Sequence, residues 1–253
     1  SIGSFAFSSC TSLTNVTIPD GVTTIGSSAF SSCTSLTNVT IPDGVTAIGS
    51  SAFYGCTELR SITIPDGMTS ISSYMFYDCT NLNDVEIPNS VTSINNCAFY
   101  NCINLTKVDL PNGLTYLGAD AFHGTSITSI YIPKSLTECG RSDGFIYASG
   151  PFTGATLLTT VEFEDGIKSI PSYILTSSGY TPSDNSSTKS SISKIIIPNS
   201  VTSIGESAFY GCRALIDIYI PDSVTRINDC AFGYCSGLTS ITIPDLSLIH
   251  ISE

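Results

Sequence analysis

The sequence predicts an elongated β-rich solenoid of about ten coils of 23 residues, built from short strands and turns with little helix. Three observations predict this fold class. Ile-Pro or Leu-Pro recurs at a constant interval, beginning at Ile18, Ile41, Ile64, Ile87 and Leu110, and the segments 13–35 and 36–58 are almost identical. Within each unit, apolar and polar residues alternate with the period of two that is typical of half-buried strands.

The repeat unit has the consensus L-x-x-V-x-I-P-[DN]-[GS]-V-T-x-I-[GN]-x-x-A-F-x-x-C-x-x. We assign residues 1–245 to a single solenoid. Regular units begin at Leu13, Leu36, Leu59, Leu82, Leu105, Ile192 and Leu215.

Each unit predicts its own elements in order. L-x-x-V-x-I predicts a short strand, which the following proline ends because it lacks an amide donor. Asp-Gly or Asn-Ser then favours a turn, and V-T-x-I predicts a second short extended segment. The Gly or Asn that follows predicts a left-handed backbone. A-F-x-x-C leads into the next unit. If the coils stack, the phenylalanines of this segment should align as a column of Phe7, Phe30, Phe53, Phe76, Phe99, Phe122, Phe152, Phe209 and Phe232.

Two units are longer than the others. One begins at Ile127 and ends before Leu158, and the next begins at Leu158 and ends before Ile192. The irregular coils therefore cover residues 127–191, and their extra residues predict inserted surface loops near 141–151 and 176–191.

Residues 246–253 break the pattern, because Ser247 and His250 stand where the repeat predicts apolar residues. This out-of-register tail looks like a translated sequencing adaptor, and we expect it to be an artefact. Both ends of the solenoid look cut, so we expect a fragment whose uncapped ends favour end-to-end self-association.

Composition excludes several classes of partner. The net charge of −12 and the isoelectric point near 4.3 argue against nucleic acid, which requires a basic surface. No apolar stretch approaches the length of a membrane-spanning segment.

The repeat unit resembles the BspA-like class of leucine-rich repeats over residues 1 to about 245. The resemblance implies a leucine-rich-repeat solenoid on a secreted or surface-anchored protein. It also implies an extracellular or cell-surface location, and adhesion to host matrix proteins or other cells.

Cysteines recur at one position of the unit, from Cys10 to Cys102 and again at Cys212 and Cys235. Buried thiols explain this column, although stacked neighbours would also lie within disulfide reach. Local Cys97–Cys102 and Cys230–Cys235 disulfides are the other alternative. A straight ladder without interleaved His argues against a metal.

We predict no catalytic residues, cofactor or metal, and hence no enzyme. Only His123 and His250 offer an imidazole, and His123 stands where other units carry Tyr. Each Gly recurs alone at its own position in the unit, so no phosphate-binding motif is present.

The candidate binding residues point outward from the predicted strands and gather carboxylates and aromatic rings. They are Asp84, Glu86, Asp109, Tyr131, Glu162 and Tyr219. A secondary stripe of Tyr54, Tyr77, Tyr100 and His123 would lie on the opposite side. The inserted loops contribute Arg141, Phe145, Tyr147 and Tyr180 as a third set.

Two hypotheses follow. The chain is a non-enzymatic binding module that holds an extracellular protein or glycan, or it is a passive stalk that presents another domain. The near-identical units at residues 13–58 suit a spacer, and the varied residues from 84 to 162 suit recognition.

Overall fold

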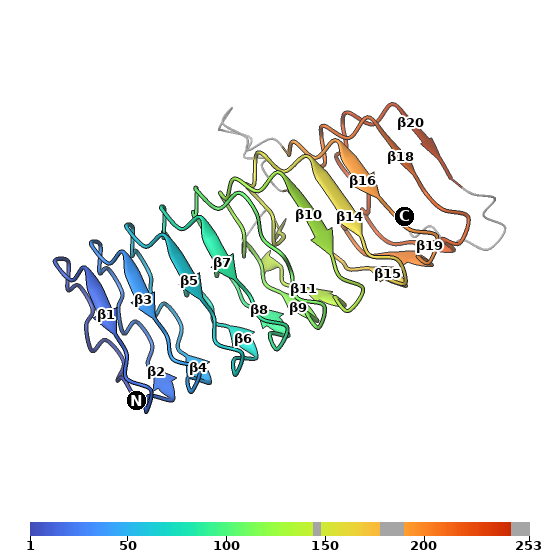
Figure 1. Ribbon diagram of the computed structural model, residues 1–253. Helices are drawn as coiled ribbons and strands as arrows, with labels where there is room; N and C mark the ends of the chain where they lie inside the picture. The colour runs from blue at the N-terminus through green and yellow to red at the C-terminus, as the bar shows by residue number, and fades with distance from the viewer. Residues whose placement is uncertain (144–147, 178–189, 244–253) are drawn as a thin grey trace.

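The computed structural model describes residues 1–143, 148–177 and 190–243 as one elongated solenoid (Figure 1). Within these residues there is no helix. The strands form two rows along the long axis, and the amino-terminal coils lie at one end (Figure 1). The predicted β-rich solenoid with little helix is confirmed.

The first row comes from the L-x-x-V-x-I segments. It comprises β1 (Asn15–Thr17), β3 (Asn38–Thr40), β5 (Ser61–Thr63), β7 (Asp84–Glu86), β10 (Ser129–Ile132), β14 (Thr160–Phe163), β16 (Lys194–Ile196), β18 (Asp217–Tyr219) and β20 (Ser240–Thr242). The second row comes from the V-T-x-I segments. It comprises β2 (Thr24–Ile25), β4 (Ala47–Ile48), β6 (Ser70–Ile71), β8 (Ser93–Ile94), β9 (Tyr116–Leu117), β11 (Glu138–Cys139), β15 (Ser169–Ile170), β17 (Ser203–Ile204) and β19 (Arg226–Ile227).

Neighbouring coils pair in parallel, with equivalent residues opposite each other. Val16 pairs with Val39, and Ile71 pairs with Ile94. The middle residue of each three-residue first-row strand points inward and its two neighbours point outward. Like side chains therefore form rows along the solenoid.

The first row is not one continuous ladder. It divides into β1–β3, β5–β7, β10–β14–β16 and β18–β20. The strand expected around Lys107 and Asp109 does not form, although Val108 between them is buried. The apolar pattern thus fixes which side chain points inward, whereas pairing also depends on the spacing of the two coils.

The predicted phenylalanine column is present from Phe7 to Phe152. Successive ring centroids lie 5.3 to 5.8 Å apart, and their planes differ by 4° to 18°. Leu175 then occupies the ring position, and beyond it Phe209 meets Phe163 edge-on. Burial of each such ring contributes about 1.5–3 kcal/mol, and parallel stacking adds to this.

The cysteine column lies beside the rings. Cys33, Cys56, Cys79 and Cys102 each direct Sγ to the carbonyl oxygen of a phenylalanine in the preceding coil, at 3.1 or 3.2 Å. Burial raises the pKa of Cys56 to about 12. All ten cysteines are thiols. This arrangement favours packing as the reason for the column, rather than disulfides at Cys97–Cys102 or Cys230–Cys235.

The expectation of a left-handed backbone after V-T-x-I is wrong. Positive φ angles occur instead one residue before the Ala of A-F, as at Ser51, and one residue before the Cys, as at Gly55. Gly49 allows its coil to lie close to the preceding one, because a Cβ there would lie 2.7 Å from Cα of Ser27 in that coil. Where Asn95 stands at the equivalent position, its side-chain amide donates to the Ile71 carbonyl.

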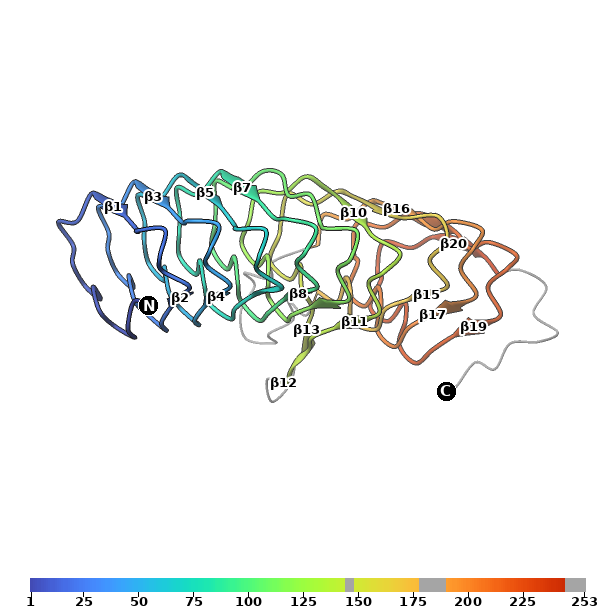
Figure 2. The same ribbon diagram turned by 60° about the horizontal axis from the view of Figure 1, so that its bottom comes forward.

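The insertion at 141–151 contains an antiparallel hairpin of β12 (Ser142–Asp143) and β13 (Ala148–Ser149). It projects from the side of the solenoid away from the first row of strands (Figure 2). Most of the second insertion, at 176–191, and the whole tail at 246–253 lie outside the described residues.

Candidate functional site

We call the outward side chains of the first row the strand face. They occupy the first and third positions of each strand, as in Asp84 and Glu86 of β7 or Ser129 and Tyr131 of β10. The buried residues between them anchor the face to the core. The third-position residue is Thr in β1, β3 and β5, and in the later strands it is, in order, Glu86, Tyr131, Glu162, Ile196, Tyr219 and Thr242.

The acidic part of the face is carried by β7. Asp84 and Glu86 are exposed and stand opposite Ser61 and Thr63 of β5. Asp109 is also exposed, but Lys107 Nζ lies 2.7 Å from its Oδ2. All three carboxylates therefore lie on the surface, and the charge of Asp109 is balanced by Lys107 within its own coil.

The aromatic part lies on the continuous sheet β10–β14–β16. Tyr131 stands opposite Glu162, and Glu162 stands opposite Ile196. Tyr131 is 49% exposed and Ile196 is 36% exposed. Farther along the row, Tyr219 of β18 is 64% exposed. Ile196 was not among the predicted site residues, although its apolar side chain at an outward position was the signal that could have identified it.

Charged groups just beyond the ends of β10 and β14 shift the pKa values of neighbouring side chains. Lys134 donates to Glu164 through both its backbone N–H and its Nζ, each at 2.9 Å. These hydrogen bonds hold the pKa of Glu164 below its usual value. Partial desolvation, followed by the carboxylates of Glu164 and Glu162, raises the pKa of Tyr131, which therefore stays a neutral phenol.

The secondary stripe is a packed stack. Ring centroids of Tyr54, Tyr77, Tyr100 and His123 follow one another at 4.9, 4.6 and 4.2 Å with nearly parallel planes. All four side chains are half-buried. Burial and the neighbouring Tyr100 raise the pKa of Tyr77 to about 12. The stripe supports the solenoid from outside the phenylalanine column.

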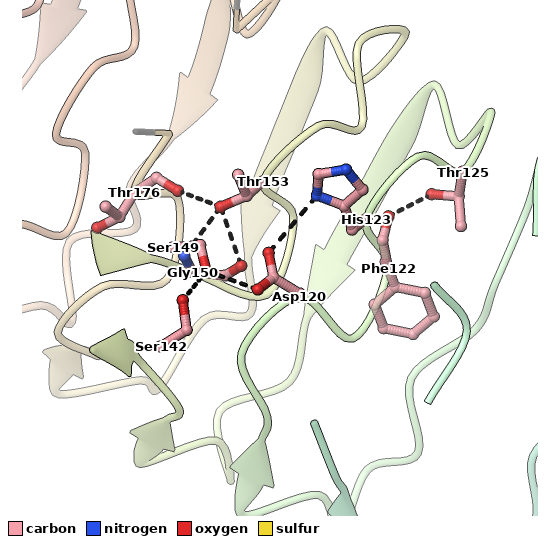
Figure 3. A network of polar contacts seen from close by, with 9 residues as sticks. All are labelled: Asp120, Phe122, His123, Thr125, Ser142, Ser149, Gly150, Thr153 and Thr176. Atoms are coloured by element: carbon pink, nitrogen blue, oxygen red, sulfur yellow. Dashed lines mark hydrogen bonds and ion pairs between the residues drawn. The ribbon is translucent and has the colours of Figure 1, made fainter. Parts of the chain in front are cut away.

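The stack ends at a polar network beneath the hairpin (Figure 3). Asp120 accepts a 2.6 Å hydrogen bond from Ser149, whose hydroxyl also contacts Ser142. Thr153 and Thr176, both buried, occupy the position that Tyr or His holds in the secondary stripe. Their hydroxyls hydrogen-bond to backbone groups.

This network lacks the geometry of a catalytic triad. His123 Nδ1 lies 3.5 Å from Asp120 Oδ1 and is buried without a hydrogen bond. Ser149 donates to the Asp120 carboxylate and not to an imidazole nitrogen, so the serine–histidine hydrogen bond of a triad is missing. The arrangement instead fixes the base of the hairpin against the coil of Asp120.

The inserted-loop candidates are only partly described. The Arg141 guanidinium lies 5.0 Å from the Tyr173 ring centroid and donates to its hydroxyl at 2.8 Å. This contact attaches the start of the hairpin to a later coil. Phe145, Tyr147 and Tyr180 lie outside the described residues.

The part of the chain that the structure describes has neither a metal-binding cluster nor a membrane-spanning helix. No three His, Cys, Asp or Glu side chains are grouped as a metal site would need. No helix there has the length and apolar character needed to cross a membrane.

Comparison with protein families decides the identity of the repeat. The family model described as "BspA type Leucine rich repeat region" matches in six copies over residues 1–96, 23–148 and 183–253. The chain belongs to this family. No match is found among curated proteins.

Solved structures agree with the fold. A leucine-rich repeat protein from Bacteroides ovatus is 25% identical with a TM-score of 0.50, over 99% of this chain and 78% of that one. The T. pallidum leucine-rich repeat protein TpLRR is 22% identical with a TM-score of 0.52, over 79% of this chain and 77% of that one. The second likeness concerns the fold alone. The BspA-type chain is therefore a leucine-rich-repeat solenoid.

Proposed function

We propose that this chain is a non-enzymatic, extracellular protein-binding module that mediates adhesion through its strand face. One observation carries the proposal: Tyr131, Ile196 and Tyr219 are exposed on the same face as Glu162. Exposed aromatic residues among polar ones are typical of interface centres. Their strands are anchored by a buried apolar core, so the surface is preorganised.

The family membership supports the same proposal, because BspA-type leucine-rich repeats are generally surface protein-interaction modules. We propose an extracellular or cell-surface location on the family membership alone.

The test is binding of the purified chain to immobilised fibronectin, fibrinogen, laminin and collagen. We expect binding to at least one, and a loss of about tenfold or more when Tyr131→Ser and Tyr219→Ser are combined, as for interface anchors. The matched control is Thr17→Ser with Thr242→Ser, which changes the same strand position at the two ends of the row.

The passive stalk is the competing function. The near-identical coils at residues 13–58 favour it, because Asn15 and Thr17 on the strand face recur unchanged as Asn38 and Thr40. Unchanged adhesion by the Tyr131→Ser and Tyr219→Ser protein, with its circular dichroism spectrum intact, would contradict recognition by this face. Absence of binding to all four matrix proteins would contradict the proposed adhesion to matrix.

A further inference from the structure

The strand ladder is interrupted between β3 and β5. β3 pairs with β1, and β5 pairs with β7, but β3 and β5 do not pair with each other. The second row is also interrupted here, because β4 belongs to one sheet and β6 to another. One edge of β3 and one edge of β5 therefore keep backbone groups that no ladder partner satisfies.

The same two coils remain in contact on the phenylalanine side. The Phe53 amide donates to the Met75 carbonyl at 3.0 Å. The Phe53 and Phe76 ring centroids lie 5.8 Å apart, the widest spacing in the stack from Phe7 to Phe152. The two coils also stay in contact just before the strands, where the Arg60 amide lies 3.5 Å from the Thr37 carbonyl oxygen. The loss of pairing is therefore confined to the β3 and β5 segments themselves.

A solvent-open cleft of about 410 Å³ lies over these two strands on the strand face. Its walls are β3, Ile41 and β5. Val39 and Ile62 are buried between the outward residues of their strands. The polar groups at the mouth are one amide and three hydroxyls, supplied by Asn38, Thr40, Ser61 and Thr63, all exposed.

The lining selects a class of ligand. All its side chains are uncharged, so an ion entering the cavity would lose hydration without gaining a counter-charge. An apolar ligand would leave the amide, the hydroxyls and the strand edges unsatisfied. A neutral ligand rich in hydroxyl groups can both donate to and accept from these groups. The volume lies within the range of small-molecule sites.

We propose that the cleft between β3 and β5 binds a neutral carbohydrate of about disaccharide size. This site is separate from the proposed protein-binding surface around Tyr131 and Tyr219. What distinguishes this site is the missing pairing of β3 and β5, and not the types of its residues. Asn15 and Thr17 repeat the side chains of Asn38 and Thr40 one coil earlier, but there β1 and β3 are paired.

The experiment is titration of the ¹⁵N-labelled chain with cellobiose, maltose, lactose and N,N′-diacetylchitobiose, followed by amide chemical shifts. We expect saturable shifts with at least one disaccharide, centred on residues 38–41 and 61–63. Thr40→Val and Thr63→Val, which keep the β-branched shape, should each weaken binding about fivefold by removing one hydrogen bond. Thr17→Val, at the same position of the near-identical coil, should leave the affinity unchanged.

Three results would overturn the proposal: no saturable shift with any of the four sugars, shifts centred elsewhere, or an equal loss in Thr17→Val. The result is independent of the adhesion experiment. Tyr131→Ser with Tyr219→Ser should weaken matrix binding and retain sugar binding, whereas Thr40→Val should weaken sugar binding and retain matrix binding.

Discussion

Residues 13–122 and residues 127–215 both stack coils around an apolar core, but they differ in unit length and in ring packing. In the first region the units have 23 residues, except for the 22-residue unit that begins at Leu105, and each phenylalanine ring stacks on the next. In the second, two longer units intervene, Leu175 replaces a ring, and the β12–β13 hairpin departs from the coil. Yet Tyr131, Glu162 and Ile196 stay in register. The extra residues of the first insertion project on the other side, so the strand face is preserved while the opposite side varies.

The largest expected effect is the loss of stability when a side chain of the ring column is truncated, either where the column has phenylalanine or where it has Leu175. Phe76→Ala should lower the free energy of unfolding by about 3–5 kcal/mol, because it leaves a cavity between two stacked rings. Leu175→Ala should cost less, about 2–4 kcal/mol, since no stacked ring contact is lost. Urea denaturation of both variants measures the difference. A loss below about 1 kcal/mol for Phe76→Ala would show that the column is not a core.

A second test concerns the closeness of the regular coils. Gly49→Ala should destabilise by about 1–3 kcal/mol, because its new Cβ overlaps the backbone of Ser27. The control is Ser72→Ala at the equivalent position, which already has a Cβ and donates to the Ile48 carbonyl. Its loss should be about 1 kcal/mol, that of one hydrogen bond. Thermal denaturation compares the two, and a tolerated Gly49→Ala would contradict the close approach.

A smaller, local effect is expected at the hairpin. Ser149→Ala removes the 2.6 Å donor to the partly buried Asp120 carboxylate and should cost about 1–3 kcal/mol. Because this contact holds the hairpin base, amide hydrogen exchange should accelerate at residues 148–153 and stay slow in the phenylalanine column. Acceleration throughout the solenoid would instead make this contact part of the global fold.

The smallest effect belongs to the Lys134–Glu164 pair. Since Lys134 depresses the pKa of Glu164, the pair stabilises the folded state above the unfolded carboxyl pKa. That contribution is lost as the pH falls through the lower, folded-state value. The free energies of unfolding of wild type and Glu164→Gln should therefore differ slightly near neutral pH and converge once the pH is below the folded-state pKa of Glu164. A difference that grows on acidification would reverse the assigned sign.

The sequence predicts the features that repeat and misses those that depend on spacing between coils. Register, the inward Val and Ile residues and the ring column follow from the constant period of the repeat. The missing strand at Lys107 and Asp109 and the gap between β3 and β5 have no counterpart in the apolar pattern. The position of Gly49 was predicted to have a left-handed backbone because the flexibility of glycine is visible in sequence, whereas the backbone of Ser27 beside it is not. Asp109 was predicted as a candidate binding residue, and its pairing with Lys107 depends on side-chain geometry that the apolar pattern does not specify.

In-register stacking across the longest units is the central claim, and engineered disulfides test it directly. Tyr131→Cys and Glu162→Cys place thiols on directly paired residues, at a spacing compatible with a disulfide. Tyr131→Cys with Thr160→Cys is the out-of-register control. Mild oxidation followed by peptide mass spectrometry should find the 131–162 link and little of the 131–160 link. Equal yields, or a preferred 131–160 link, would contradict the stacked register.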